Sequence, residues 1–384
     1  MHRDLILIIC SLLLLSAPVH AGLLLFTPGP GSVSTTSVKD TADGPDDRFI
    51  FATDNGRSEY NGTWSIFHIW HSDYTEGPLS EFCTAVESDA DGNLWIGYPN
   101  GLQITRDGTQ YTTIDDQQLL KNLAINDLQA RGSEMWVATG NAGIHRFYDG
   151  AWTWYKPHAQ NSPGCYRVEA MAVDYDDGAL YAASRQEGIW KLDDSAGGFS
   201  ECLDRGSRIL GVEGIGSDVS TGIFYYNETH LFRYRQDSGS TPVLDIADLP
   251  PGTNEINAVS QTTAGMYVIA TDGGVIGWQD GAIVLHLDRT DGLVSNLVKY
   301  VAVDNADRIW FANTEYVGCY FEDRPASPIP VMAPTSEPLA EDGPAEDAAV
   351  AEAGTDATEP SVPEMLVVLA GKFFADLQSL ILST

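Results

Sequence analysis

Short acidic turns are the segments of this sequence that most resemble a metal site. Asp89, Asp91 and Asn93 have the alternate spacing of the oxygen ligands that open a calcium-binding loop. The twelfth position, where such a loop needs a bidentate carboxylate, falls on Asn100. Because Asp-Gly is also the usual chemistry of a tight hairpin turn, we predict structural turns, with calcium as the alternative.

Other patterns that could carry chemistry are sparse. The eight histidines include one close pair, His68 and His71, with Asp73 nearby. Residues three apart in an extended chain do not point at one site, so we predict no metal and no cofactor there. The sequence contains no serine nucleophile elbow and no phosphate-binding glycine loop. Catalytic residues of a repeat protein can come from separate repeats, so these absences leave an enzyme open.

Cysteines and asparagines offer covalent chemistry that depends on the compartment. Four cysteines follow the leader that is described below, and an even number allows three pairings in an oxidising compartment. Of these pairings we predict a disulfide between Cys165 and Cys202. Asn61 and Asn227 each begin an Asn-x-Thr sequence, which makes them candidate glycosylation sites in an exported chain.

The elements that must position these groups come from a repeat. A segment of the form apolar-aromatic-apolar, usually ending in Ala or Gly, recurs seven times at spacings of 41 to 45 residues, with anchors at Ile50, Trp95, Trp136, Tyr181, Phe224, Val268 and Trp310. In each copy a β-branched run and a turn precede the anchor, and two further short strands follow it. Four short strands per forty-odd residues predict an all-β fold, a seven-bladed β-propeller of four-stranded blades.

Closure of the ring needs a strand from elsewhere. The seventh copy stops after its third strand, whereas residues 22–28 match the fourth-strand pattern of residues 150–157. We therefore predict that residues 23–26 form the outer strand of the last blade and that the propeller spans residues 22–324. Trp95, Trp136 and Trp310 occupy one blade position, so we predict that they pack between blades.

The repeats carry a family resemblance that covers all seven copies and is close in those around Trp95, Trp136 and Trp310. Residues 91–97 with Asn100-Gly101-Leu102, and residues 292–296 with 301–304, resemble the two-component regulator propeller repeat. That repeat occurs in the extracellular sensor parts of hybrid histidine kinases and in exported propellers, so the resemblance implies a sensor-like, exported propeller. The copies at Phe224 and Val268 match it least. The chain is also similar, more weakly, to streptogramin-lyase-like propellers, which share the Asp-Gly-Asn…Trp turn.

Strand order predicts which face binds a ligand. The loops between strands two and three, and between successive blades, emerge at one end of an up-and-down propeller, and here they are the longer ones. They carry flat aromatic and hydrogen-bonding side chains that suit a sugar or a peptide. The candidate ligand-binding residues are Trp70, His71, Tyr74, Tyr155, His158, Tyr166, Arg185 and Arg289.

Both ends of the chain differ from the repeats in composition. Residues 1–21 have a basic start, an apolar run and a small-residue cleavage site, and are predicted to be a signal peptide. Residues 325–363 are rich in Pro, Ala and acidic residues and are predicted to be a disordered linker. Residues 364–384 are predicted to form an amphipathic helix that docks on a partner or a membrane, the alternative being a membrane anchor. The candidate docking residues are Phe373, Phe374, Leu377 and Ile381.

Charge and composition limit the function. With 21 basic and 54 acidic residues the net charge is −33, so we expect no binding to nucleic acid. The 37 glycines and 19 prolines favour turns and short strands over an all-α enzyme.

The sequence as a whole favours a recognition module. We expect a secreted, periplasmic or cell-surface propeller that binds an envelope protein or glycan, with possible membrane contact through its C-terminal helix, and we expect no enzymatic activity. The alternatives are a lyase or hydrolase acting on a carbohydrate or lactone, and an envelope scaffold subunit.

Overall fold

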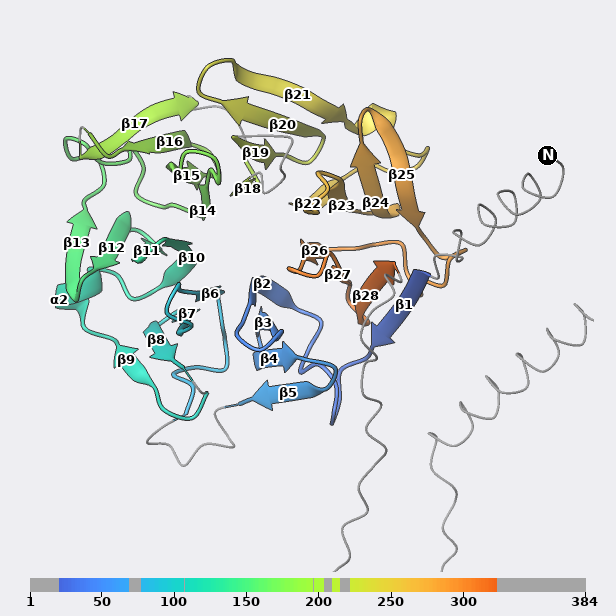
Figure 1. Ribbon diagram of the computed structural model, residues 1–384, viewed down its shortest axis with the longest axis horizontal. Coiled ribbons are helices and arrows are strands. Elements are labelled where there is room, and N and C mark those ends of the chain that lie inside the picture. Colours follow the sequence, from blue (N-terminus) through green and yellow to red (C-terminus); the bar gives the residue numbers. More distant parts are fainter. Residues whose placement is uncertain are drawn as a thin grey trace, which may run out of the picture. The chain divides into compact units, whose positions relative to one another are not determined.

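Seven four-stranded antiparallel sheets surround a common axis (Figure 1). The computed structural model describes residues 21–68, 77–106, 108–195, 197–203, 209–214 and 222–322. The chain divides into two compact units, Met1–Ile329 and Pro330–Thr384, and the described residues all belong to the first. The predicted seven-bladed, all-β propeller is therefore confirmed, whereas the predicted signal peptide, linker and C-terminal helix lie outside the described residues.

Blades one to six each consist of four consecutive strands, which follow one another from the axis to the rim. The strands of blades one to three are β2 (Val38–Asp43), β3 (Phe49–Thr53), β4 (Gly56–Tyr60) and β5 (Trp64–Phe67); β6 (Ala85–Ser88), β7 (Leu94–Tyr98), β8 (Gly101–Thr105) and β9 (Thr112–Ile114); and β10 (Ile125–Arg131), β11 (Glu134–Thr139), β12 (Ile144–Tyr148) and β13 (Ala151–Tyr155). Those of blades four to six are β14 (Ala170–Val173), β15 (Leu180–Ser184), β16 (Gly188–Asp193) and β17 (Gly198–Leu203); β18 (Gly211–Gly214), β19 (Ile223–Tyr226), β20 (His230–Arg235) and β21 (Gly239–Asp245); and β22 (Ile256–Gln261), β23 (Tyr267–Thr271), β24 (Gly274–Gln279) and β25 (Ala282–Leu287). Two short helices, α2 (Gln117–Leu120) and the 3-10 helix η2 (Ile246–Asp248), lie in connections between blades.

Blade seven is completed by the first strand of the chain. It contains β26 (Tyr300–Val303), β27 (Ile309–Ala312) and β28 (Val317–Glu322), and β1 (Ala21–Phe26) pairs antiparallel with β28. Gly22 lies opposite Phe321, and a Cβ atom on Gly22 would sit only 2.2 Å from the Phe321 ring. The predicted closure by an N-terminal strand is confirmed, and it joins the two ends of the ring by main-chain hydrogen bonds.

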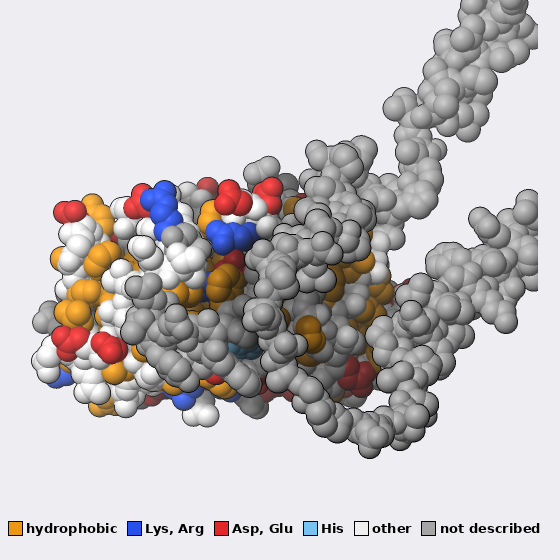
Figure 2. Space-filling view, turned by 90° about the horizontal axis from the view of Figure 1, so that it is seen from below, with side chains coloured by type: hydrophobic (Ala, Val, Ile, Leu, Met, Phe, Trp, Pro, Cys, Tyr) orange, Lys and Arg blue, Asp and Glu red, His pale blue; other side chains and the backbone are white. Residues whose placement is uncertain are grey.

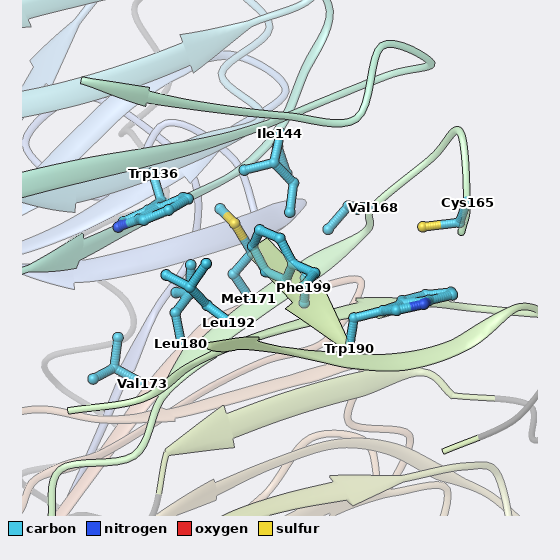
Figure 3. Close-up of a cluster of buried hydrophobic side chains, with 12 residues drawn as sticks. Trp136, Ile144, Cys165, Val168, Met171, Val173, Leu180, Trp190, Leu192 and Phe199 are labelled. Carbon is cyan, nitrogen blue, oxygen red and sulfur yellow. The ribbon is translucent and has the colours of Figure 1, made fainter. Parts of the chain in front are cut away.

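The second strand of each blade is buried on both faces because a neighbouring blade covers each face. This explains why the anchor segments read as continuous apolar runs instead of alternating ones. Trp95, Trp136 and Trp310 are at most 2% exposed, which confirms their predicted packing role. Figure 3 shows Trp136 in the cluster between blades three and four, with residues from both blades around it.

Glycines at the start of the third strands allow the outer strand to come close. Gly101 and Gly274 have φ values of +144° and +125°, which a residue with a side chain rarely adopts. A Cβ atom on Gly274 would lie 2.2 Å from the carbonyl oxygen of Leu287, the last residue of β25. The glycine-bearing turns that the sequence repeats are thus a requirement of close backbone packing.

Candidate functional site

The two ends of the ring differ in their connections. We call one end the loop face; it carries the connections between strands two and three of each blade and those between successive blades. The other end, the turn face, carries the hairpins between strands one and two and between strands three and four. Figure 2 shows the ring from one side, with charged side chains gathered toward its two edges.

The structure places the predicted ligand-binding residues in several different surroundings. Trp70, His71 and Tyr74 lie outside the described residues. Tyr155 ends β13 and is half-buried, with its ring centroid 5.4 Å from those of Trp136 and Phe199, so it packs between blades three and four. Tyr155 therefore belongs to the interface between the blades and not to a ligand-binding loop.

His158 and Tyr166 are brought together on the loop face. Their ring centroids lie 4.6 Å apart in a T-shaped arrangement, and Tyr166 is 61% exposed. The Gly143 amide donates a hydrogen bond to the Tyr166 carbonyl, which attaches this loop to the turn between β11 and β12. Trp154 lies on the other side of that turn, where its indole N–H donates to the carbonyl of Ala142.

The two predicted arginines lie in other loops of the same face. Arg185 follows β15 and its amide donates to the carboxylate of Glu169. Arg289 follows β25, where its amide donates to the side chain of Asn296. The connection between β15 and β16 of blade four and the loop between blades six and seven therefore contribute separately to this face.

Large apolar side chains that are more than one third exposed are concentrated on the loop face. Among the described residues, those in its connections are Phe82, Leu119, Tyr166, Val294 and Leu297. Trp154 adds a sixth at the loop-face end of β13. In the hairpins and strand ends of the turn face, Tyr148, Tyr175 and Ile283 are comparable, and Val284, Leu24 and Leu25 lie along the rim strands β25 and β1. Scattered apolar exposure is normal on a surface, but this uneven distribution is typical of an interaction face.

On the turn face, acidic side chains close hairpins. The carboxylate of Asp89 accepts hydrogen bonds from the amides of Asp91 and Asn93 and from the indole of Trp95, at 2.8 to 3.0 Å. Asp304 does the same six residues before Trp310. Asp89 therefore acts as the predicted structural turn residue, and Asp304 has the same role in blade seven. Among the described residues no group of three or more His, Cys, Asp or Glu side chains is arranged to hold a metal.

The inner strands surround a central cavity of about 410 Å³ that contains carboxyl groups. Asp40, Glu87, Asp127 and Glu213 line it. Burial raises the pKa of Asp40 to about 6 and the pKa values of Glu87 and Glu213 to about 8, and it raises the pKa of Asp127 well above its ordinary value. These groups therefore retain protons at pH values where exposed carboxyls are ionised.

Each of these carboxyls fastens its blade to the next one. Asp40 accepts a hydrogen bond from the Val86 amide at 2.9 Å, and Glu87 accepts one from the Ala130 amide at 2.9 Å. Asp127 accepts one from the Met171 amide at 2.5 Å. The arrangement supplies inter-blade hydrogen bonds at the axis.

The sequence analysis did not single out these channel residues. A usable signal was present, because Asp40 and Asp127 occupy the same register in repeats one and three. Asp40 pairs with Ala52 and Asp127 with Ala138, each directly after an irregularity in the first strand. The other repeats have mostly apolar or small residues at this position. An acid there therefore indicates a side chain that hydrogen-bonds to one particular group, here an amide of the next blade.

Blade one holds a buried ion pair that the sequence also did not reveal. Glu59 lies 2.9 Å from Nε of Arg57 and 3.0 Å from Nη1 of Arg48. The Arg57 guanidinium is fully buried and lies 4.0 Å from the centre of the Phe67 ring. Burial lowers the pKa of Arg57, but Glu59 together with Tyr111, Tyr98 and Cys83 outweighs it, so that the pKa lies above its ordinary value. Arg57 therefore stays charged inside the protein.

His145 occupies in blade three the position that Arg57 occupies in blade one, the second residue of the third strand. Its ring is fully buried and lies parallel to Trp154, with centroids 6.1 Å apart. Neither ring nitrogen has a hydrogen-bond partner, and burial lowers the pKa of His145 to about 4. The imidazole is therefore neutral, and its ring packs parallel to that of the exposed Trp154.

The predicted disulfide between Cys165 and Cys202 is not formed. Cys165 belongs to the cluster between blades three and four, as Figure 3 shows, whereas Cys202 packs against the cluster between blades four and five. Blade four itself separates the two sulfur atoms. The glycosylation candidates Asn61 and Asn227 lie in the hairpin between β4 and β5 and in the turn between β19 and β20.

Comparisons with known proteins identify the fold. The sequence matches no protein-family model and no curated protein. Among solved structures, the extracellular domain of a hybrid two-component system from B. thetaiotaomicron aligns with a TM-score of 0.61 and 14% identity over 78% of this chain and 40% of that chain. A second such domain from the same organism aligns with a TM-score of 0.60 and 15% identity over 75% of this chain and 40% of that chain. A streptogramin B lyase aligns with a TM-score of 0.60 and 12% identity over 79% of this chain and 98% of that chain.

Both kinds of propeller that the sequence resembles are thus found among solved structures with this fold. The chain spans about two fifths of the length of the two-component domains that it matches. At 12 to 15% identity the likeness establishes a shared architecture, and activities and ligands do not follow from it. Among the described residues, no helix has the length and apolarity needed to cross a membrane.

Proposed function

We propose that this chain is an exported, sensor-like recognition propeller that binds a protein or glycan of the cell envelope through its loop face. The observation that carries the proposal is the concentration of exposed apolar side chains on that face. Exposed apolar surface costs free energy unless a ligand covers it, and a face built of loops on a rigid ring is a common site of binding. The extracellular two-component domains among the solved propellers support the same assignment.

Placement at the envelope rests on the two ends of the chain. A leader over residues 1–21 would export the propeller, and the apolar segment over residues 364–384 would retain it through the acidic linker. A ligand-binding ring on a tether samples a large volume near the surface that holds it. This arrangement suits a sensor or an accessory protein.

The enzymatic alternative would draw on the channel carboxyls. A lyase or hydrolase needs a general acid or base within reach of its substrate. Asp40 and Asp127 each have both carboxylate oxygens bonded to main-chain amides, so they act as fasteners of the ring. The loop face therefore supports recognition better than the channel supports catalysis.

The decisive experiment compares the two faces in capture of envelope components. The full chain and a variant with L119A, Y166A and L297A would be immobilised and exposed to solubilised cell envelope, with Y148A/Y175A as the matched turn-face control. We expect the loop-face variant to capture at least tenfold less of the component that the unchanged chain binds. Equal loss in the turn-face control, or none in the loop-face variant, would refute the proposal.

The tail is tested in the same assay. Truncation after Arg324 should leave capture through the loop face intact and should release the protein from the envelope. Loss of capture on truncation would assign binding to the tail and not to the blades. Self-association with no captured component would favour the scaffold alternative.

A further inference from the structure

Blade one holds more positive than negative charge around Arg57. The side chain of Arg57 is only 1% exposed, and its Nε lies 2.9 Å from Oε1 of Glu59. The other oxygen of that carboxylate, Oε2, lies 3.0 Å from Nη1 of Arg48. Among the described residues, no other carboxylate forms an ion pair with either arginine. Two guanidinium groups therefore share one carboxylate, which leaves one positive charge of the cluster unbalanced.

The far end of the Arg57 guanidinium carries donors without acceptors. Nη1 and Nη2 are buried, and neither has a hydrogen-bond partner in the described part of the chain. The Phe67 ring, whose centre lies 4.0 Å from Cζ of Arg57, supplies a cation–π attraction but no oxygen acceptor. A buried N–H without an acceptor costs free energy, and such groups in folded proteins mark the position of an ion or a water molecule.

The neighbouring side chains do not supply the missing negative charge. Cys83 and Tyr98 are fully buried and lie close enough to Arg57 to influence its pKa. Burial raises the pKa of the Cys83 thiol to about 12 and the pKa of the Tyr98 phenol well above its ordinary value. Both groups therefore stay neutral at physiological pH and keep a hydrogen that can be donated.

The third polar neighbour of Arg57 is occupied. The hydroxyl of Tyr111 donates a hydrogen bond to the carbonyl of Gly108 at 2.9 Å. A Cβ atom on Gly108 would lie 3.3 Å from Nη2 of Arg57, so the β8–β9 hairpin of blade two covers this end of the guanidinium. The interior beside Arg57 is therefore rich in donors and poor in acceptors.

A small anion matches this surplus of donors. A charged acceptor supplies both the missing hydrogen bonds and the missing negative charge, whereas a water molecule supplies hydrogen bonds alone. A phosphate or sulfate would bring several oxygen atoms, and each of them would need a donor of its own inside the protein. A halide is a single atom that accepts from several donors at once.

We propose that a halide ion, such as chloride, binds between blades one and two at the Nη1–Nη2 end of the Arg57 guanidinium. The site lies inside the ring and does not depend on what the loop face binds. The net charge of −33 does not exclude it, because exposed carboxylates farther away than about 8 Å are largely screened at physiological salt. Since Arg57 belongs to blade one and Tyr98 to blade two, the ion would hold the two blades together.

Thermal unfolding of the full chain tests the site. Sodium chloride would be compared with sodium gluconate, whose anion is too large for the interior, at a constant ionic strength of about 0.15 M. An ion that binds only the folded chain stabilises it by mass action, so we expect an unfolding midpoint at least about 3 °C higher in chloride.

Three variants locate the effect. R57M/E59Q removes the donors and their charged partner together and keeps unbranched side chains, so the difference between chloride and gluconate should disappear. R48M leaves Arg57 and Glu59 as a balanced pair, and the difference should fall by half or more. R131M is the matched control, because Arg131 also pairs with a carboxylate, that of Asp194, and it should keep the full difference.

Equal differences in the unchanged chain and in R57M/E59Q would overturn the proposal, because the anion effect would then be a general effect of salt. Identical midpoints of the unchanged chain in chloride and gluconate would also overturn it. If R57M/E59Q does not fold, crystals of the unchanged chain grown in sodium bromide decide the question. They should show an anomalous-scattering peak within about 3.5 Å of Nη1 and Nη2 of Arg57, and the proposal fails if that peak is missing.

Discussion

The loop face and the turn face are built from the same repeat, yet they differ in the side chains that they expose. On the turn face, Asp89 and Asp304 bind their own hairpin amides and the indoles of Trp95 and Trp310, and nearby arginines are paired. On the loop face, large apolar side chains such as Leu119 and Tyr166 are exposed in the connections. The difference indicates that the turn face holds the ring together and that the loop face is left to meet something else.

The largest expected effect is at the turn-face end of blade one. E59A removes the carboxylate that pairs with Arg57 in the described part of the chain, and leaves the buried guanidinium without that counter-charge. Breaking a buried ion pair in this way costs about 3 to 5 kcal/mol of the free energy of unfolding. Urea denaturation measures it, with K121A on the loop face as the control. Equal effects of the two substitutions would remove the distinction between the faces.

A pH series tests the channel carboxyls, which lie between the two faces. The pKa of Glu87 is about 8 in the folded protein and near its ordinary 4.5 in the unfolded chain. The folded state therefore binds more protons between these values, and the free energy of unfolding falls as pH rises through that window. E87Q should reduce this fall by about 4 kcal/mol between pH 5 and pH 9. An unchanged slope would mean that the Glu87 proton is not linked to folding.

Substitution of a turn aspartate should change the free energy of unfolding by a smaller amount. D304A removes the acceptor of the Trp310 indole, of the Ala306 amide and of the Arg308 side chain. The buried indole N–H of Trp310 is then left without a partner, and we expect a loss of about 2 kcal/mol in the free energy of unfolding. Thermal or urea unfolding measures this loss, and D304N should recover part of it by keeping one acceptor oxygen. A loss below about 0.5 kcal/mol would show that this turn is dispensable.

The smallest effect on stability is expected where the effect on binding is largest. L119A and Y166A change side chains that are already exposed, so each should alter the free energy of unfolding by no more than about 0.5 kcal/mol. A greater loss of stability would show that these residues serve the loops themselves. The comparison of the two faces would then no longer separate binding from folding.

The fold was predictable because the sequence repeats it. Seven anchors at nearly equal spacing, and a strand at residues 23–26 that fits the missing position, leave few architectures other than a closed ring. The aspartate–tryptophan turns were predictable as well, since Asp89 and Trp95 lie six residues apart and interact within one hairpin. Local interactions of this kind are encoded over a few residues and recur with each blade.

The candidate site was predictable only in part. Strand order assigned the long loops to one end, and His158 and Tyr166 do lie together there. The half-buried position of Tyr155 and the separate location of Arg289 depend on how the loops fold back on neighbouring blades. Ion pairs such as that of Arg167 with Glu169 could not be read from the sequence, because an ion pair is a property of distance and not of composition.

The sequence by itself determined the number of blades, the closing strand and the turns, because each follows from spacing or from contacts within one repeat. Only the tertiary structure decided which groups meet across blades. It separated Cys165 from Cys202 by the thickness of a sheet, bonded Asp40 and Asp127 to the amides of the next blade, and enclosed Arg57 beside Glu59. Those contacts join residues tens of positions apart, and the sequence specifies them only through the packing of the whole ring.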